Sequence, residues 1–144
     1  ARRRRVAALG DGSALRMLER IGEALGGYPR VVAEPDRLRI APKRVVVSAP
    51  RRGFVRRIDG RELGLAAVAL GAGRTRSDQP VDPAVGITVH TKPGDAVDEG
   101  APLATLHVRS RRKTAPVRER VEAAFTLGAR RPAPRPLVLE AIRR

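Results

Sequence analysis

Four short segments between residues 43 and 108 are rich in valine, isoleucine and leucine, and turn-forming residues such as glycine, proline and aspartate separate them. Runs of this kind are typical of β-strands. With one tyrosine, two phenylalanines and no tryptophan in the chain, alanine, valine, leucine and isoleucine must fill any core. The four predicted strands span residues 43–49, 53–59, 85–91 and 102–108.

Two helices are predicted around these strands. Residues 61–70 have helical composition, and Asp59 is suited to cap the N-terminus of that helix with its carboxylate. Thr114 opens the second helix, in which four apolar residues recur on one side. Those residues are Val117, Val121, Ala124 and Phe125. Together the strands and helices predict an α+β fold.

A further amphipathic helix is predicted near the start of the chain, over residues 14–25. Either Asp11 or Ser13 can cap its beginning, and the glycine pair at 26–27 ends it. Its apolar face comprises Ala14, Met17, Leu18, Ile21, Ala24 and Leu25. Apolar residues at this spacing form a face that packs against a core, so we expect Met17 to be a core residue.

The predicted elements divide the chain into two parts. Residues 1–42 form a helix and a linker, because residues 28–42 contain three prolines and show no clear period. Residues 43–144 form the α+β domain. Within that domain we expect a solvated, charged loop at 109–113 and a short apolar run at 137–142 that docks on the body.

A glycine-rich segment that carries arginines, GAGRTR, follows the 61–70 helix. In a phosphate-binding loop the glycines precede a helix, whose N–H groups then face the anion. Here the helix comes first, so the glycines are expected to end it with positive φ angles. The segment is therefore predicted to be a polar loop. Its residues are Gly71, Gly73, Arg74, Thr75, Arg76, Ser77 and Asp78.

The net charge of +15 invites a nucleic-acid function. The basic residues, however, are spread over the whole chain and the few aromatic residues provide no stacking platform, which favours a compositional bias towards arginine.

The chain has no cysteine, which excludes disulfides and thiolate metal sites and fits a reducing cytoplasm. We expect no signal peptide, and no apolar run in the sequence is long enough to span a membrane. We expect no cofactor and no metal.

The two histidines, His90 and His107, both lie in predicted strands. A structural hydrogen bond is the expected role for each, although the two would be neighbours if their strands pair. A two-histidine metal site would then lack an obvious third ligand. The carboxylates fall at turns and helix starts, and no nucleophile–base pair is recognisable. The residues alone therefore indicate a binding, lid or structural module without a self-sufficient active site.

Residues 89–108, VHTKPGDAVDEGAPLATLHV, resemble a half-repeat of the biotinyl/lipoyl carrier domain. That fold presents a modified lysine on a tight hairpin turn. No lysine occupies such a turn here, because the chain continues as LHVRSRRK after the second strand. A stand-alone barrel-sandwich binding module without a modifiable lysine is thus one alternative.

Residues 53–108 resemble more closely the C-terminal domain of the thymidine phosphorylase/pyrimidine-nucleoside phosphorylase family. The pattern runs G-x-V-x-x-I-D, a helix ending in L-G-x-G-R, then D-x-x-V-G, G-D-x-V and P-L-x-x-L-H. The resemblance extends to the 14–25 helix and to the C-terminal PLVLEAI. The matching positions are Gly53, Val55, Ile58, Asp59, Leu70, Gly71, Gly73, Arg74, Val81, Asp82, Val85, Gly86, Gly94, Asp95, Val97, Pro102, Leu103, Leu106 and His107.

This resemblance implies a C-terminal domain with a barrel-sandwich/hammerhead-like β-sheet and helices, trailing from a missing α/β phosphorylase domain. Enzymes of the family cleave pyrimidine nucleosides with phosphate, giving free base and (deoxy)ribose 1-phosphate, and the complete enzyme is expected to be a homodimer. Their phosphate-binding and base-binding motifs lie in the N-terminal part and have no counterpart here. No catalytic residue is therefore assigned, and the chain alone is expected to be inactive.

The resemblance also implies a role for the segment from Gly71 to Asp78. In the family, the loop after L-G-x-G-R lies near the domain cleft and takes part in its closure. The polar residues of this segment would then form a lid or an interdomain contact that excludes water. In the alternative interpretation, Arg74 only ties the helix end to a carboxylate such as Asp82.

Overall fold

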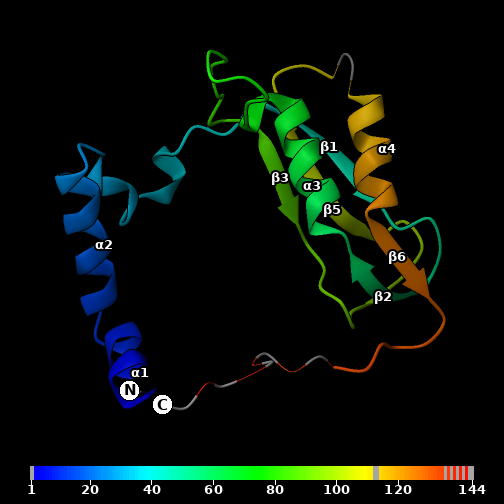
Figure 1. Ribbon diagram of the computed structural model, residues 1–144, viewed down its shortest axis with the longest axis horizontal. Helices are drawn as coiled ribbons and strands as arrows, with labels where there is room; N and C mark the ends of the chain where they lie inside the picture. The colour runs from blue at the N-terminus through cyan, green and yellow to red at the C-terminus, as the bar shows by residue number, and fades with distance from the viewer. Residues whose placement is uncertain are drawn as a thin grey trace. The chain divides into compact units, whose positions relative to one another are not determined.

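The computed structural model describes residues 2–111, 114–134, 136, 138, 140 and 142, and the chain divides into two units, residues 1–39 and 40–144 (Figure 1). The first unit is helical and the second contains all the described strands. Among the described residues, no helix combines the length and the hydrophobicity needed to cross a bilayer.

The first unit contains the predicted helix and one that was not predicted. Its elements are α1 (Arg2–Gly10), α2 (Ser13–Ala24) and two short 3-10 helices, η1 (Pro29–Val31) and η2 (Pro35–Arg37). The Asp11 carboxylate accepts a hydrogen bond from the Ser13 N–H at 2.8 Å, and Gly26 follows α2 with a φ of 74°. Helix α1 was not predicted because its apolar residues show no helical period. It is rich in arginine and alanine, which have high intrinsic helix propensity, and that propensity does not depend on a period.

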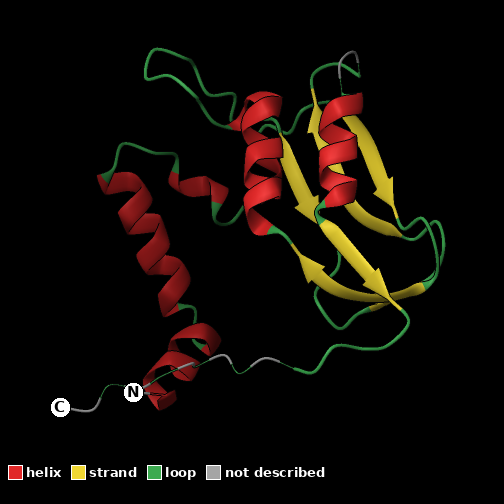
Figure 2. Cartoon of the chain, turned by 45° about the vertical axis from the view of Figure 1, so that its right-hand side comes forward, coloured by secondary structure: helices red, strands yellow, loops and turns green. Residues whose placement is uncertain are grey.

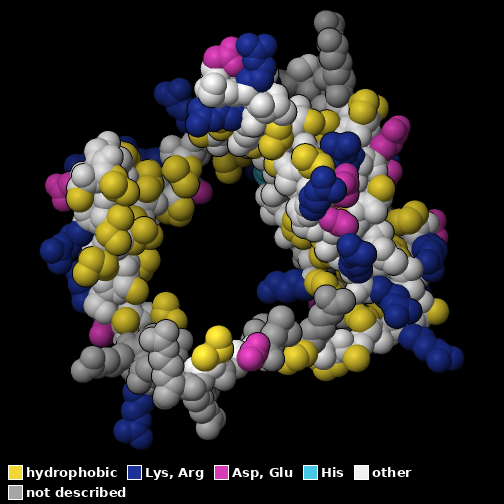
Figure 3. Space-filling view, viewed as in Figure 1, with side chains coloured by type: hydrophobic (Ala, Val, Ile, Leu, Met, Phe, Trp, Pro, Cys, Tyr) yellow, Lys and Arg dark blue, Asp and Glu magenta, His cyan; other side chains and the backbone are white. Residues whose placement is uncertain are grey.

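The apolar face of α2 is not buried, contrary to prediction. Met17, Leu18 and Ile21 keep about half of their surface exposed, at 50%, 54% and 48%. Within the described residues of its own unit, the main contacts of α2 are with α1 and η1, and these leave the apolar face exposed. Figure 3 shows hydrophobic side chains exposed along this helix. The placement of Met17 in a core is therefore wrong.

The described residues of the second unit form two three-stranded antiparallel sheets. One has the order β1 (Lys43–Ser48), β5 (Pro102–Val108), β3 (Gly86–Val89). The other has the order β4 (Ala96–Val97), β2 (Gly53–Ile58), β6 (Phe125–Gly128). The helices α3 (Gly60–Ala67) and α4 (Ala115–Ala123) lie side by side over the sheets, as Figure 2 shows. The predicted α+β fold and its four strands are confirmed.

The core between sheets and helices is aliphatic, as the scarcity of aromatic residues predicted. Its largest fully buried side chains are Val47, Val55, Leu103, Leu106 and Val121. The Asp59 carboxylate caps α3 by accepting hydrogen bonds from the N–H groups of Arg61 and Glu62, at 3.1 and 3.3 Å. This cap fixes where β2 stops and the helix starts.

Two predictions near the C-terminus need correction. Phe125 is not on the last helix, because α4 ends at Ala123 and Phe125 begins β6, pairing with Ile58 of β2. Phe125 is nevertheless buried, so the prediction that it packs in the core is confirmed. The predicted docking run covers 137–142, of which positions 137, 139 and 141 lie outside the described residues. Val138 and Ile142 are 70% and 87% exposed, so neither is docked.

Candidate functional site

The residues predicted to form a polar loop lie between α3 and β3 and project from the second unit (Figures 1 and 2). Helix α3 continues as one π-helical turn, η3 (Val68–Ala72), which ends where Gly71 adopts a φ of 102°. The Gly71 carbonyl then accepts a hydrogen bond from the Asp82 N–H at 2.9 Å. This bond closes the base of the segment from residue 71 to residue 82, so its two ends are held together.

Glycine is required at positions 71 and 73 of this loop for different physical reasons. Gly71 has the positive φ expected where a helix ends. Gly73 does not: its φ of −147° and ψ of −176° are extended backbone that any residue adopts. A Cβ at position 73 would instead lie 2.7 Å from Cγ2 of Val68, which is closer than packed carbons approach. The prediction of a turning glycine holds for Gly71 only.

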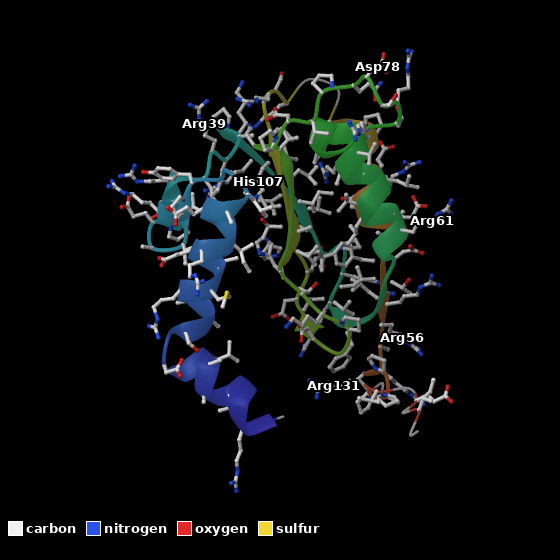
Figure 4. All side chains as sticks on the ribbon, turned by 60° about the vertical axis from the view of Figure 1, so that its left-hand side comes forward. Arg39, Arg56, Arg61, Asp78, His107 and Arg131 are labelled. Carbon is white, nitrogen blue, oxygen red and sulfur yellow. The ribbon has the colours of Figure 1, made fainter. Side chains whose placement is uncertain are left out.

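The loop's polar groups bond to one another. The Arg74 guanidinium donates to the Ser77 carbonyl at 3.2 Å, and the Arg76 guanidinium holds the Asp78 carboxylate with two bonds of 3.2 and 3.1 Å. Residues 74–80 are exposed, and Figure 4 shows Asp78 at the far end of the loop. The 71–78 loop, as we call this segment, is thus held together by its own contacts, and its outer surface is exposed.

Asp82 is not the partner of Arg74. Its carboxylate is held by Arg109, at the end of β5, with a bond of 2.7 Å from Nε and one of 2.9 Å from Nη2. It also accepts from the Ala84 N–H at 3.0 Å. Hydrogen bonding from Arg109, assisted by that N–H, lowers the pKa of the Asp82 carboxyl. The interpretation in which Arg74 ties the helix end to Asp82 is therefore wrong.

We expect Asp82→Asn to lower the melting temperature at pH 7, because it removes the charge that Arg109 binds. The folded-state pKa of Asp82 is depressed, so its contribution to stability is present above the unfolded value of about 3.9 and is lost as the pH falls through the folded value. Thermal unfolding of both proteins between pH 7 and pH 2 measures this. The two melting temperatures should converge at the acidic end; a constant difference contradicts the assignment.

Both histidines are held by threonines across the β3–β5 pairing. His107 Nε2 lies 2.8 Å from the Thr88 hydroxyl, and His90 Nε2 lies 2.8 Å from that of Thr105. Thr88 and Thr105 are directly opposite each other in the register. The predicted structural hydrogen bonds are confirmed. No group of three histidines or acidic residues able to hold a metal occurs in the described part of the chain.

A pocket that the sequence did not predict lies elsewhere in the second unit, with a volume of about 560 Å³. The 71–78 loop contributes nothing to its lining. Its walls come from β2, from the turn before β4 and from the segment after β6. The lining residues are Arg56, Arg57, Ile58, Pro93, Gly94, Asp95, Arg131, Pro132, Ala133 and Pro134.

Sequence reasoning also missed Arg109, which was assigned to a solvated, charged loop. It is exposed, but it fixes the base of the 71–78 loop through Asp82. The antiparallel pairing of β3 and β5 explains this, since Asp82 precedes β3 and Arg109 follows β5. Once that pairing is assumed, opposite charges at the two positions are the signal that could have revealed the pair.

Comparison with known proteins finds two kinds of similarity. Residues 54–129 match the family model of the pyrimidine nucleoside phosphorylase C-terminal domain. Over 136 residues the chain is 35% identical to a thymidine phosphorylase of Sinorhizobium fredii, covering 94% of this chain and 31% of that protein. It is 39% identical to the thymidine phosphorylase of Mesorhizobium japonicum over 132 residues, covering 91% and 30%, and 38% identical to that of Burkholderia lata, covering 93% and 31%. The chain thus spans about 31% of the length of these relatives.

Proposed function

This chain belongs to the pyrimidine nucleoside phosphorylase family, and we propose that it acts as the C-terminal domain of an enzyme that cleaves pyrimidine nucleosides with phosphate. The products of that reaction are the free base and (deoxy)ribose 1-phosphate. The match of residues 54–129 to the family's C-terminal domain carries this proposal. The three relatives above, all thymidine phosphorylases, support it.

In this proposal the chain supplies a scaffold, and a preceding α/β domain supplies the catalytic residues. Residues 1–42 would lead from that domain into the α+β domain of residues 43–144. Within the described residues, both histidines are engaged by threonines, which fits a domain without its own acid–base machinery. As substrates, phosphate and the nucleoside would bind at the active site of the complete enzyme only, a homodimer that serves nucleoside salvage in the cytoplasm.

The 71–78 loop is proposed to close over the cleft between the two domains. Three features support this: its exposed position, its internal hydrogen bonds and its closed base at Gly71 and Asp82. A loop that is already folded can meet another surface as a unit, and closure excludes water from the reacting groups. The residues assigned to this role are Gly71, Gly73, Arg74, Thr75, Arg76, Ser77 and Asp78.

Phosphate-dependent release of free base from thymidine and uridine tests whether the catalytic residues lie in the preceding domain and not in this chain. The 144-residue chain is assayed alone and then mixed with the N-terminal portion of a homologous thymidine phosphorylase. We expect no turnover alone and measurable turnover after mixing. Turnover by the chain alone would mean that it holds a complete active site. Absence of turnover in both samples would leave the family fold in place and favour a structural role.

The closure role is tested in the same complemented enzyme by Arg76→Ala combined with Asp78→Ala, which removes the bidentate pair within the loop. We expect kcat/KM to fall by about tenfold or more, because misplaced closing groups are costly to catalysis. Stability should hardly change, since exposed ion pairs contribute little. Arg52→Ala is the matched control, because Arg52 is 87% exposed and faces Asp98 at 3.5 Å. An equal loss in both variants contradicts the closure role.

A further inference from the structure

The arginine-lined pocket, defined by the ten lining residues given above, lies at the end of the second unit away from the 71–78 loop. Figure 4 shows Arg56 and Arg131 at one end of this unit and Asp78 at the other. Three of the pocket's lining side chains are guanidinium groups, from Arg56, Arg57 and Arg131, and one is a carboxylate, from Asp95. The proposed phosphorylase function uses none of these four residues.

One wall of the pocket is a rigid turn. The Gly94 N–H donates to the Val55 carbonyl at 2.8 Å, and the Val55 N–H donates to the Asp95 carbonyl at 2.9 Å. The Asp95 carboxylate accepts from the Lys92 N–H at 2.7 Å. The turn is therefore fixed to β2, and the one acidic group of the lining already has a backbone donor as its partner.

Arg131 is oriented by this turn. Its Nε donates a hydrogen bond to the Gly94 carbonyl at 2.9 Å. Because a guanidinium carries five N–H donors in a fixed plane, this bond sets the plane and uses one donor. The four N–H donors of the two terminal nitrogens then remain for a bound anion, since Arg131 makes no other hydrogen bond or ion pair among the described residues.

Arg56 reaches the pocket across strand β6. A Cβ at position 128 would overlap the Arg56 side chain at Cδ, so the stem of Arg56 occupies the space that Gly128 leaves open. In the described part of the chain its guanidinium has no hydrogen-bond or ion-pair partner. Arg57, by contrast, is paired with Asp59 at 2.9 Å. Arg56 and Arg131 are thus the two cations available to a ligand.

We propose that the arginine-lined pocket binds a phosphomonoester of about the size of a sugar phosphate. Each guanidinium can pair with two oxygens, and the two groups together carry a charge of +2. A dianionic phosphate with three terminal oxygens therefore matches them better than a single carboxylate does. A volume of about 560 Å³ is in the range of small-molecule sites and leaves room for an organic group beside the phosphate. That group would lie against the apolar side of the lining, formed by Ile58, Pro93, Pro132, Ala133 and Pro134.

Calorimetric titration of the full 144-residue chain tests this with four probes: glucose 6-phosphate, inorganic phosphate, glucose and acetate. We expect glucose 6-phosphate to bind, inorganic phosphate to bind more weakly, and glucose and acetate not to bind. Arg56→Gln and Arg131→Gln should each weaken the binding of glucose 6-phosphate by about tenfold, the loss that accompanies a charge-assisted hydrogen bond. Arg61→Gln, an exposed arginine on α3 outside the lining, should leave the affinity within about twofold.

The variant Gly128→Ala tests whether the position of the Arg56 side chain matters for binding, apart from the positive charge of the pocket. This variant keeps every arginine but displaces the Arg56 stem, so it should weaken binding nearly as much as Arg56→Gln. Circular dichroism and melting temperatures verify that each variant is folded. Absence of binding by the unmodified chain, or an equal loss in Arg61→Gln, overturns the site. Inorganic phosphate that binds as tightly as glucose 6-phosphate overturns the organic part of the proposal.

Discussion

Replacing Leu106 by alanine is expected to lower the free energy of unfolding by about 2–5 kcal/mol. Leu106 is fully buried at the centre of β5, opposite Val45 of β1 and Ile87 of β3. Removing its side chain leaves a cavity among the strands of this sheet, because neighbours that are themselves hydrogen-bonded into strands cannot move in to fill it. Thermal unfolding should show a decrease in melting temperature of about 10 °C or more.

Leu65→Ala is the control for this substitution. Leu65 lies on α3 and is 39% exposed. Leu65→Ala removes the same side-chain atoms as Leu106→Ala, but at a position that is already partly in contact with water. Its effect should be well below that of Leu106→Ala, since less apolar surface returns to solvent. Equal losses from the two substitutions would show that the sheet formed by β1, β5 and β3 is not the core of this unit.

Replacing Gly73 by alanine is expected to destabilise the protein by about 1–3 kcal/mol, the usual result of forcing extra volume into a packed site. The backbone angles at position 73 suit any residue, so the cost comes from the contact with Val68. Val68 is β-branched and stiff, and it lies in the π-helical turn, so it cannot rotate away freely. Chemical denaturation of the variant measures the loss.

Gly60→Ala is the matched control. Gly60 begins α3, has no atom within 4 Å of an added Cβ and does not have a positive φ. Alanine should therefore be neutral there or stabilise the protein by about 0.4–1 kcal/mol, through reduced freedom of the unfolded chain. If Gly73→Ala were equally harmless, the close approach of residues 68 and 73 would not restrain the base of the 71–78 loop.

The sequence predicted those parts of the fold that depend on local patterns. Strands β1, β2, β3 and β5 have alternating or continuous apolar residues, and Asp59 lies where a capping carboxylate is needed, so both features were found. Strand β4 has two residues and follows a turn, which gives no period to detect. Strand β6 was missed because Phe125 continues the apolar spacing of α4, and only its pairing with β2 ends the helix.

The candidate sites depend on contacts between distant residues, and these were harder to predict. Arg109 and Asp82 are separated by 27 positions, and Arg131 and Gly94 by 37. In a chain with 30 basic residues, and before the strand pairing is known, no charge pattern distinguishes the arginines that have a fixed partner from those that do not. Gly128 likewise gave no signal, because the reason for it is the side chain of a neighbouring strand, Arg56.

The internal bonding of the 71–78 loop has a consequence for how this domain can change over evolutionary time. Its polar groups satisfy one another, and its link to the body runs through Gly71, Asp82 and Arg109. Substitutions at the exposed positions 74–80 should therefore leave the folding of the remainder of the unit almost unchanged. Descendants of this sequence can alter the exposed surface of this loop while the sheets and helices remain under separate selection for packing.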